Sequence, residues 1–272
     1  MTAADRWGDA LRSWALPPDL LAAVADSPYA SVPALWRRAR LAERPGAGGE
    51  TAAVLGRLLG ERGSLLDVGA GTGRVSLPFA AAGHRVTAVE HGEAMAEGFR
   101  AEAAELGAKA RLIEGEWPAV AADAGLHDVA VCANAAYDVA DIGPFLTALE
   151  AAARRAVVVE LTEEHPWSHL RPYFRALHGH ELPDRPTLAD FVEVVTEVAG
   201  ARPDVRRWSR AGVLHFADLQ ELLAFYGRRL LVPPERADEL LEILAPDIGH
   251  HEGWLTLGDL ERPTATVWWA TA

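Results

Sequence analysis

The sequence has a single cysteine, Cys132, so no disulfide can form within the chain. Because Cys132 lies in an apolar stretch, we expect a buried and unreactive thiol. No apolar run is long enough to cross a bilayer, and the first residues lack the basic and apolar segments of a secretory signal. These absences predict a cytoplasmic protein that does not bind membranes.

Basic residues are few: 26 Lys and Arg stand against 39 Asp and Glu, which gives a net charge of −13. Nucleic-acid phosphates are bound by basic surfaces, so we expect no nucleic-acid partner. The pairs Arg154–Arg155 and Arg228–Arg229 are expected to be solvated helix ends. Half of the 272 residues are hydrophobic, which is enough for a sizeable core.

Two common nucleotide-binding motifs are missing. No G-x-x-x-x-G-K-[ST] string occurs, which excludes a P-loop. The dinucleotide motif G-x-G-x-x-G is not matched either, because the third glycine comes one residue early, at Gly73, and Arg74 stands in its place. The chain has instead the run Leu65–Gly73, a short apolar segment that ends in a loop with glycine at every second position.

A second apolar segment, Val86–Glu90, ends in a carboxylate seventeen residues after Gly73. In an open parallel sheet, ligands bind at the carboxyl ends of the strands, and glycines let the backbone come close to a ligand. Glu90 is then placed to accept hydrogen bonds from both hydroxyls of a ribose. The two segments together predict a nucleoside site.

The pattern D-x-G-x-G-x-G after a strand resembles motif I of the class I S-adenosylmethionine-dependent methyltransferases. The resemblance covers about residues 60–165 and implies S-adenosyl-L-methionine as the cofactor. It also implies that the methionyl part of the cofactor is surrounded by Asp67, Gly69, Ala70, Gly71 and Gly73. Asp67 would accept a hydrogen bond from the ammonium group or, alternatively, from amides of its own loop.

The resemblance implies further cofactor contacts at the ends of the next strands, beyond the ribose contact of the second strand. His91 and Met95 would pack against the adenine, although Met95 is equally typical of a core. Glu116, where the family more often has aspartate, would accept from the adenine amino group beside Trp117. That tryptophan is also consistent with a core anchor. Asn134, after the fourth strand, would face the methionyl end.

Three further residues are candidates for the acceptor side. His165 and His169 lie four residues apart and would share one face of a helix. Histidine is the usual general base for a hydroxyl acceptor, so oxygen is favoured as the methylated atom, ahead of nitrogen or carbon. No Glu follows the first histidine as in H-E-x-x-H, and no metal is predicted. Tyr137 would line the acceptor pocket.

From Ser64 onward, strand and helix patterns alternate, as in a parallel sheet with crossover helices. The predicted strands are Ser64–Val68, Arg85–Glu90, Ala110–Glu114, Asp128–Ala133, Ala156–Leu161, Asp204–Ser209 and Thr264–Thr271. The predicted helices are Arg74–Ala82, Glu93–Leu106, Ile142–Arg154, Thr187–Val198, Asp218–Leu231 and Pro234–Leu244. The resulting fold class is α/β, with a doubly wound, seven-stranded, mostly parallel sheet whose last strand is antiparallel.

Two additions to this sheet are expected. Residues 1–62 would form N-terminal helices that act as a lid, including one over Val32–Glu43 in which Trp36–Arg38 either cover the cofactor or pack on the sheet. Residues 63–272 would be the methyltransferase domain, in which 162–255 contribute a helical substrate cap. His250–Glu252 are expected in a loop. The tryptophans near both termini fit either a homodimer interface or the core.

The sequence therefore favours a methyltransferase that acts on a small molecule, and two alternatives stay open. A nicotinamide-dependent oxidoreductase uses a similar strand, loop and helix, although Arg74 and the lack of a Tyr-x-x-x-Lys set count against it. A non-catalytic relative would bind the cofactor without turnover.

Overall fold

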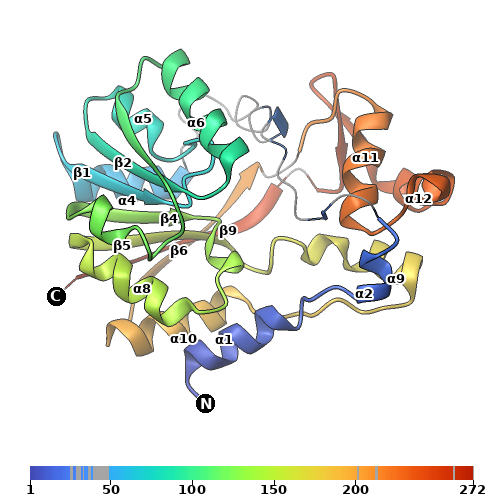
Figure 1. Ribbon diagram of the computed structural model, residues 1–272, viewed down its shortest axis with the longest axis horizontal. Coiled ribbons are helices and arrows are strands. Elements are labelled where there is room, and N and C mark those ends of the chain that lie inside the picture. The colour runs from blue at the N-terminus through green and yellow to red at the C-terminus, as the bar shows by residue number, and fades with distance from the viewer. Residues whose placement is uncertain are drawn as a thin grey trace.

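The centre of the molecule is a seven-stranded sheet with helices on both faces (Figure 1). The computed structural model describes residues 1–24, 27–28, 32, 34–35, 38, 49–200, 202–211, 214–259 and 261–271. The strands of this sheet are β1 (Ser64–Val68), β2 (Arg85–Glu90), β3 (Ala110–Glu114), β4 (His127–Ala133), β5 (Ala153–Thr162), β6 (Asp204–Ala211) and β9 (Glu261–Ala270). Their order across the sheet is β3-β2-β1-β4-β5-β9-β6.

This topology confirms the predicted doubly wound sheet. Strands β1 to β5 pair in parallel, while β9 runs antiparallel to both β5 and β6. The first three strands have the predicted bounds. Strand β5 begins at Ala153, earlier than expected, because Ala153 pairs with His127. The helix before it, α8 (Ile142–Ala151), therefore ends before Arg154.

Both faces of the sheet are covered by apolar helices. On one face, α4 (Gly49–Leu59) packs on β4, β5 and β6, while α5 (Leu77–Ala81) and α6 (Glu93–Glu105) pack on β2. The other face carries α1 (Ala3–Arg12), α8 and α10 (Leu188–Ala199), and the short α7 (Ala121–Ala124) lies between β3 and β4 in the chain. Because neighbouring strand residues face opposite ways, Val157 and Val159 of β5 join one core and Val158 joins the other.

Helix α5 is shorter than predicted. Residues 71–76 form turns rather than helix, and the helix begins at Leu77 with Pro78 in its first turn. Proline lacks an N–H group and is tolerated at a helix start, where that donor has no partner. By contrast, the capping box of Thr187 and Asp190 opens α10 as expected.

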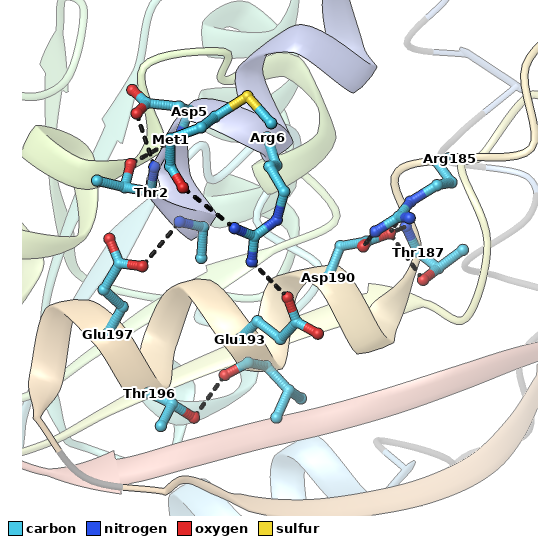
Figure 2. Close-up of polar contacts among 12 residues, drawn as sticks. Met1, Thr2, Asp5, Arg6, Arg185, Thr187, Asp190, Glu193, Thr196 and Glu197 are labelled. Carbon is cyan, nitrogen blue, oxygen red and sulfur yellow. Dashed lines mark hydrogen bonds and ion pairs between the residues drawn. The ribbon is translucent and has the colours of Figure 1, made fainter.

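The N-terminal helix is fixed to α10 and to the loop after β4. Figure 2 shows the Arg6 side chain bonded to Glu193. The Ala3 N–H donates to the Glu197 carboxylate over 2.7 Å. The main anchor is Trp7, which is fully buried and stacks on Tyr137 with ring centroids 5.3 Å apart. Its indole N–H donates to the carbonyl of Val139 over 2.9 Å.

A second apolar core lies beside the sheet, where Figure 1 places α9, α11 and α12 together. Its elements are α2 (Pro18–Leu21), α9 (Arg171–His178), α11 (Leu219–Arg229), α12 (Ala237–Leu244) and the hairpin β7 (Ile248–His251) and β8 (Trp254–Leu257). The described residues also contain four 3₁₀ turns: η1 (Ala136–Asp138), η2 (Ser168–Leu170), η3 (Pro234–Arg236) and η4 (Ala245–Asp247).

Two predicted segments outside the sheet are not confirmed by the structure. The loop predicted at His250–Glu252 is wrong for its histidines, because His250 and His251 pair with Leu255 and Trp254 in the β7–β8 hairpin. The helix predicted over Val32–Glu43 falls mostly outside the described residues, as do Trp36 and Arg37. In the described ranges, no helix has both the length and the apolar character needed to cross a membrane.

We expect Trp7→Ala to lower the free energy of unfolding by about 3–5 kcal/mol, because a fully buried aromatic ring leaves a cavity. Arg6→Ala is the matched control: its ion pair with Glu193 is exposed, and such pairs contribute about 0–1 kcal/mol. Urea denaturation followed by circular dichroism measures both. Equal losses for the two variants would contradict this account of α1.

Candidate functional site

The loop after β1 depends on three glycines. Gly69, Gly71 and Gly73 have φ values of +70°, +56° and +83°, in the left-handed region that side chains other than glycine disfavour. A Cβ on Gly69 would lie 2.6 Å from the Cβ of Ala135, and one on Gly73 would lie 2.5 Å from Leu77. On Gly71, the nearest atom would be Cε of Met95 at 3.8 Å. The loop is therefore tightly packed at its two ends and more open at its middle glycine.

Glu90 ties this loop to the end of β2. Its Oε2 accepts from the Gly71 N–H over 2.8 Å, and its Oε1 accepts from the Gly92 N–H over 2.7 Å. The amides of Gly69 and Ala70 donate to the carbonyl of Val89 beside it. Glu90 is only 6% exposed. Each carboxylate oxygen can accept a second hydrogen bond, so the carboxylate can also bind a ligand's hydroxyls.

Asp67 lies at the end of β1 and is 1% exposed. In the described part of the chain, no donor meets hydrogen-bond geometry at either of its carboxylate oxygens, and the nearby donor is the Ser76 hydroxyl. Burial raises the pKa of Asp67 to about 6, against the opposing influence of the Ser76 hydroxyl and the Arg74 charge. A buried carboxylate without a donor is costly. Among the described residues, Asp67 accepts no hydrogen bond from the amides of its own loop, so the alternative role as a cap of that loop is not observed. A hydrogen-bond donor on a ligand would satisfy its carboxylate instead.

The residues expected around an adenine are only partly brought together. His91 lies beside Glu90, with 3.6 Å between its Nδ1 and Oε1, and its side chain is 76% exposed. Met95 reaches the middle of the glycine loop. Glu116 is exposed in the loop after β3. Trp117 instead faces the core, where its indole N–H donates to the carbonyl of Phe145, so its ring serves packing.

Asn134 follows β4 and belongs to a buried polar cluster centred on Glu160. Its backbone, at a φ of +60°, and its side-chain Nδ2 both donate to Glu160, over 2.8 Å to the carbonyl and 3.0 Å to Oε1. Arg74 also donates to Oε1, and Arg210 lies 3.8 Å away. Although burial alone would raise it, the pKa of Glu160 is lowered because Arg74 and Arg210 stabilise the carboxylate.

Sequence reasoning missed Glu160 and Arg210 as members of the site. The available signal was the position of Glu160, an acid near the end of the apolar strand β5, which parallels Glu90 at the end of β2. Because the side-chain N–H of Asn134 donates to Glu160, its Oδ1 remains as an acceptor for a ligand. The cluster thus fixes the orientation of Asn134 at the carboxyl edge of the sheet.

The two histidines do not share a helical face as predicted. His169 lies in η2, whereas His165 precedes that turn. His169 has Nδ1 2.9 Å from the carbonyl of Pro166, and each ring nitrogen is 3.2 Å from a guanidinium nitrogen of Arg262. Burial, with the nearby Arg262 charge, lowers the pKa of His169 to about 3. With both nitrogens engaged, the ring is poorly suited to take a proton.

His165 and Tyr137 are also held by neighbours. His165 stacks on Trp14 with ring centroids 3.8 Å apart, and its Nδ1 accepts from the Trp167 N–H over 3.2 Å. Burial lowers the pKa of His165 to about 3. The Tyr137 hydroxyl donates to the carbonyl of Thr162 over 2.9 Å, and burial raises its pKa. These contacts make both rings parts of the wall and weaken the case for either as a general base.

A family model described as "Methyltransferase domain" matches residues 65–157, from β1 into β5. No curated protein matches the chain by sequence. Solved structures with a similar fold include a putative methyltransferase from Bacillus halodurans C-125, at 14% identity and a TM-score of 0.52, covering 82% of this chain and 99% of that one. The YcgJ protein from Bacillus subtilis has 13% identity and a TM-score of 0.51, covering 82% and 98%.

A third similar structure is a magnesium protoporphyrin IX methyltransferase from Synechocystis PCC 6803, solved with bound S-adenosylhomocysteine (SAH). Its identity is 14% and its TM-score 0.50, with 86% of this chain and 93% of that chain covered. At such identities the likeness shows the fold, and the matched family model covers the strands that carry Asp67, Glu90 and Asn134.

The raised pKa of Asp67 predicts that Asp67→Asn stabilises the folded protein, and that this stabilisation increases with pH. The folded state holds the Asp67 proton up to about pH 6, whereas the unfolded chain releases it near 3.8, so ionisation destabilises the fold at higher pH. From pH 4 to pH 8, the stability of Asp67→Asn relative to the unsubstituted protein should rise by at most about 3 kcal/mol. Urea denaturation across this range measures it.

The control for this titration is Asp123→Asn, at an exposed position on α7. It removes the same kind of carboxylate from an exposed site, and the gain in stability should be specific to Asp67→Asn. Parallel curves for Asp67→Asn and the unsubstituted protein would show that Asp67 is not a buried, destabilising charge.

Proposed function

Because the chain carries a methyltransferase domain with the class I S-adenosylmethionine-dependent methyltransferase fold, we propose that it transfers a methyl group from S-adenosyl-L-methionine to a small-molecule acceptor. One observation carries this proposal. Asp67, which is buried and has no hydrogen-bond donor in geometry among the described residues, lies beside a loop of left-handed glycines that Glu90 holds to the next strand.

The described residues fit the cofactor's chemistry. Asp67 would accept from its ammonium group, which supplies the missing donor and a compensating charge. Glu90 would accept from the ribose hydroxyls while it keeps its bonds to Gly71 and Gly92. Asn134 would turn its Oδ1 to the methionyl end, and the remaining contacts of the set would come from Gly69, Ala70, Gly73, His91, Met95, Glu116 and the backbone of Trp117.

When bound, S-adenosyl-L-methionine supplies an electrophilic methyl group on a positively charged sulfur. A lone pair of the acceptor atom forms the new bond to carbon, the carbon–sulfur pair returns to sulfur, and a proton leaves the acceptor atom where it carried one. The protein's part is to orient the acceptor, exclude water and receive that proton.

Methylation at oxygen stays a prediction, but a histidine base no longer supports it. With pKa values near 3, His165 and His169 are weak bases, so we assign them to the wall of the acceptor site together with Tyr137. Asp138 in η1 is the better candidate to receive a proton. Burial raises its pKa, and its charge interacts with those of Arg229, His91 and Glu90.

The lid and cap are part of the same proposal. Residues 1–62 would act as the lid, supported by the contacts of α1 with the loop after β4 and of Trp14 with His165. Residues 162–255 would act as the substrate cap, supported by their separate apolar core. Homodimer formation and a cytoplasmic location stay predictions. No observation in the described residues favours the nicotinamide alternative.

Glu90→Ala should weaken binding of S-adenosylhomocysteine by about 1.5–3 kcal/mol, because hydrogen bonds to the charged carboxylate are lost. This corresponds to roughly a 10- to 150-fold higher Kd by isothermal titration calorimetry. Glu114→Ala is the matched control: it removes an exposed carboxylate, paired with Arg100, from the end of the neighbouring strand. It should leave the Kd unchanged.

Unchanged affinity in Glu90→Ala would remove this residue from the cofactor site. Binding of NAD in place of S-adenosylhomocysteine by the unsubstituted protein would overturn the proposed function itself. Tight binding of S-adenosylhomocysteine with no methyl transfer to any acceptor would leave a non-catalytic cofactor-binding protein.

A further inference from the structure

Arg229, at the end of α11, has an unusual environment for a charged side chain. Its guanidinium carbon lies 4.6 Å from the ring centroid of Phe225 and 5.1 Å from that of Trp167. In the described ranges, no hydrogen-bond acceptor or carboxylate pairs with it. The expectation of a solvated helix end is therefore wrong for Arg229: it is partly buried, and burial lowers its pKa to about 10.

Arg262, at the start of β9, is a second guanidinium without a carboxylate among the described residues. It donates to the carbonyl of Pro166 over 3.0 Å and lies against the ring of His169. The charges of Arg229 and Arg262 both act on His169 and on the buried Tyr226. Two positive groups therefore flank one short stretch of the wall formed by η2 and α11.

Several other partly buried arginines in the described residues have carboxylate partners. Arg74 pairs with Glu160, Arg171 with Glu164 and Arg38 with Glu221. The chain also has a large excess of acidic residues, 39 against 26 basic ones. A lack of acidic residues therefore does not explain why Arg229 and Arg262 have no carboxylate partner among the described residues.

The position of Arg229 relates it to the proposed site. Its charge interacts with that of Asp138, and Asp138 in turn interacts with His91 and Glu90 at the end of β2. Arg229 also lies against the ring of Trp167, which follows the carboxyl end of β5 by five residues and packs on the second core. The glycine loop has a different arginine, Arg74, which is already paired with Glu160.

We propose that Arg229, supported by Arg262, binds an anionic group of the methyl acceptor, either a carboxylate or a phosphate. The proposal rests on the proposed function and names its substrate class. A guanidinium held between two aromatic rings presents its N–H groups in a fixed plane, which suits two-point binding of such an anion. The anion would also supply the charge that the surrounding residues do not.

The cofactor's own carboxylate is the other source of the same chemistry. The resemblance implies that the methionyl part lies along Asp67–Gly73, whereas the charged neighbours of Arg229 are Asp138 and Arg228. We therefore assign Arg229 to the acceptor, and the experiment below separates the two sources.

The test uses the full chain saturated with S-adenosylhomocysteine and titrates benzoate or inorganic phosphate by calorimetry, with benzamide as the neutral analogue of benzoate. At least one anion should bind, and benzamide should not. Arg229→Gln should weaken that anion at least tenfold, whereas Arg229→Lys, which keeps the charge and most of the packing, should weaken it less. Arg228→Gln is the matched control, because the neighbouring Arg228 side chain donates to the Ala224 carbonyl of its own helix. This exchange should leave the anion affinity unchanged.

Failure of both anions to bind, or binding that Arg229→Gln leaves unchanged, would overturn the proposal. If circular dichroism shows that Arg229→Gln does not fold, Arg229→Lys is compared with the unsubstituted protein instead. Equal anion affinity of these two proteins would then overturn the proposal.

A second titration compares S-adenosylhomocysteine with 5′-methylthioadenosine, which lacks the amino-acid part. Loss of affinity in Arg229→Gln for the first compound only would show that Arg229 binds the cofactor's carboxylate, and this would overturn the acceptor assignment. Failure of the unsubstituted protein to bind S-adenosylhomocysteine would instead refute the proposed function. The anion titration without cofactor then reports on Arg229 separately.

Discussion

The hydrogen bonds of Glu90 to the amides of Gly71 and Gly92 are the interaction on which the site depends. They join the loop after β1 to the end of β2, and they hold both segments around one buried carboxylate. Charge-assisted hydrogen bonds of this kind are stronger than neutral ones. The open middle of the glycine loop, Met95 and the exposed His91 all lie around this carboxylate.

Unpaired buried charge marks the functional edge of the sheet. Among the described residues, Asp67 has no hydrogen-bond donor and Arg229 has no carboxylate partner, whereas the charge of Glu160 is compensated by Arg74, and Asn134 donates to its Oε1. Burial without a partner disfavours the folded state, so such groups persist where a ligand supplies the partner. The two groups have opposite signs, and we propose opposite roles for them, Asp67 for the cofactor and Arg229 for the acceptor.

Aromatic contacts connect the N-terminal segment with the turn after β4 and with the segment after β5. Trp7 stacks on Tyr137, Tyr137 meets His165 edge-on at 5.4 Å, and His165 stacks on Trp14. Such contacts fix ring orientation as well as burying area. They explain why these residue types recur near the acceptor side of the sheet, and they account for the histidines as packing elements whose basicity is low.

The sequence by itself determined the sheet, the glycine loop and Glu90, because the alternation of strand and helix patterns and the spacing of Asp67 to Gly73 are local properties. Only the tertiary structure decided the roles of Trp117, His169, Glu160 and Arg229. Their neighbours are Phe145, Arg262, Arg74 and Trp167, which are remote in the chain, so burial and charge compensation arise only when the fold brings them together. A pKa or an unpaired charge is a property of those surroundings, and no local pattern encodes it.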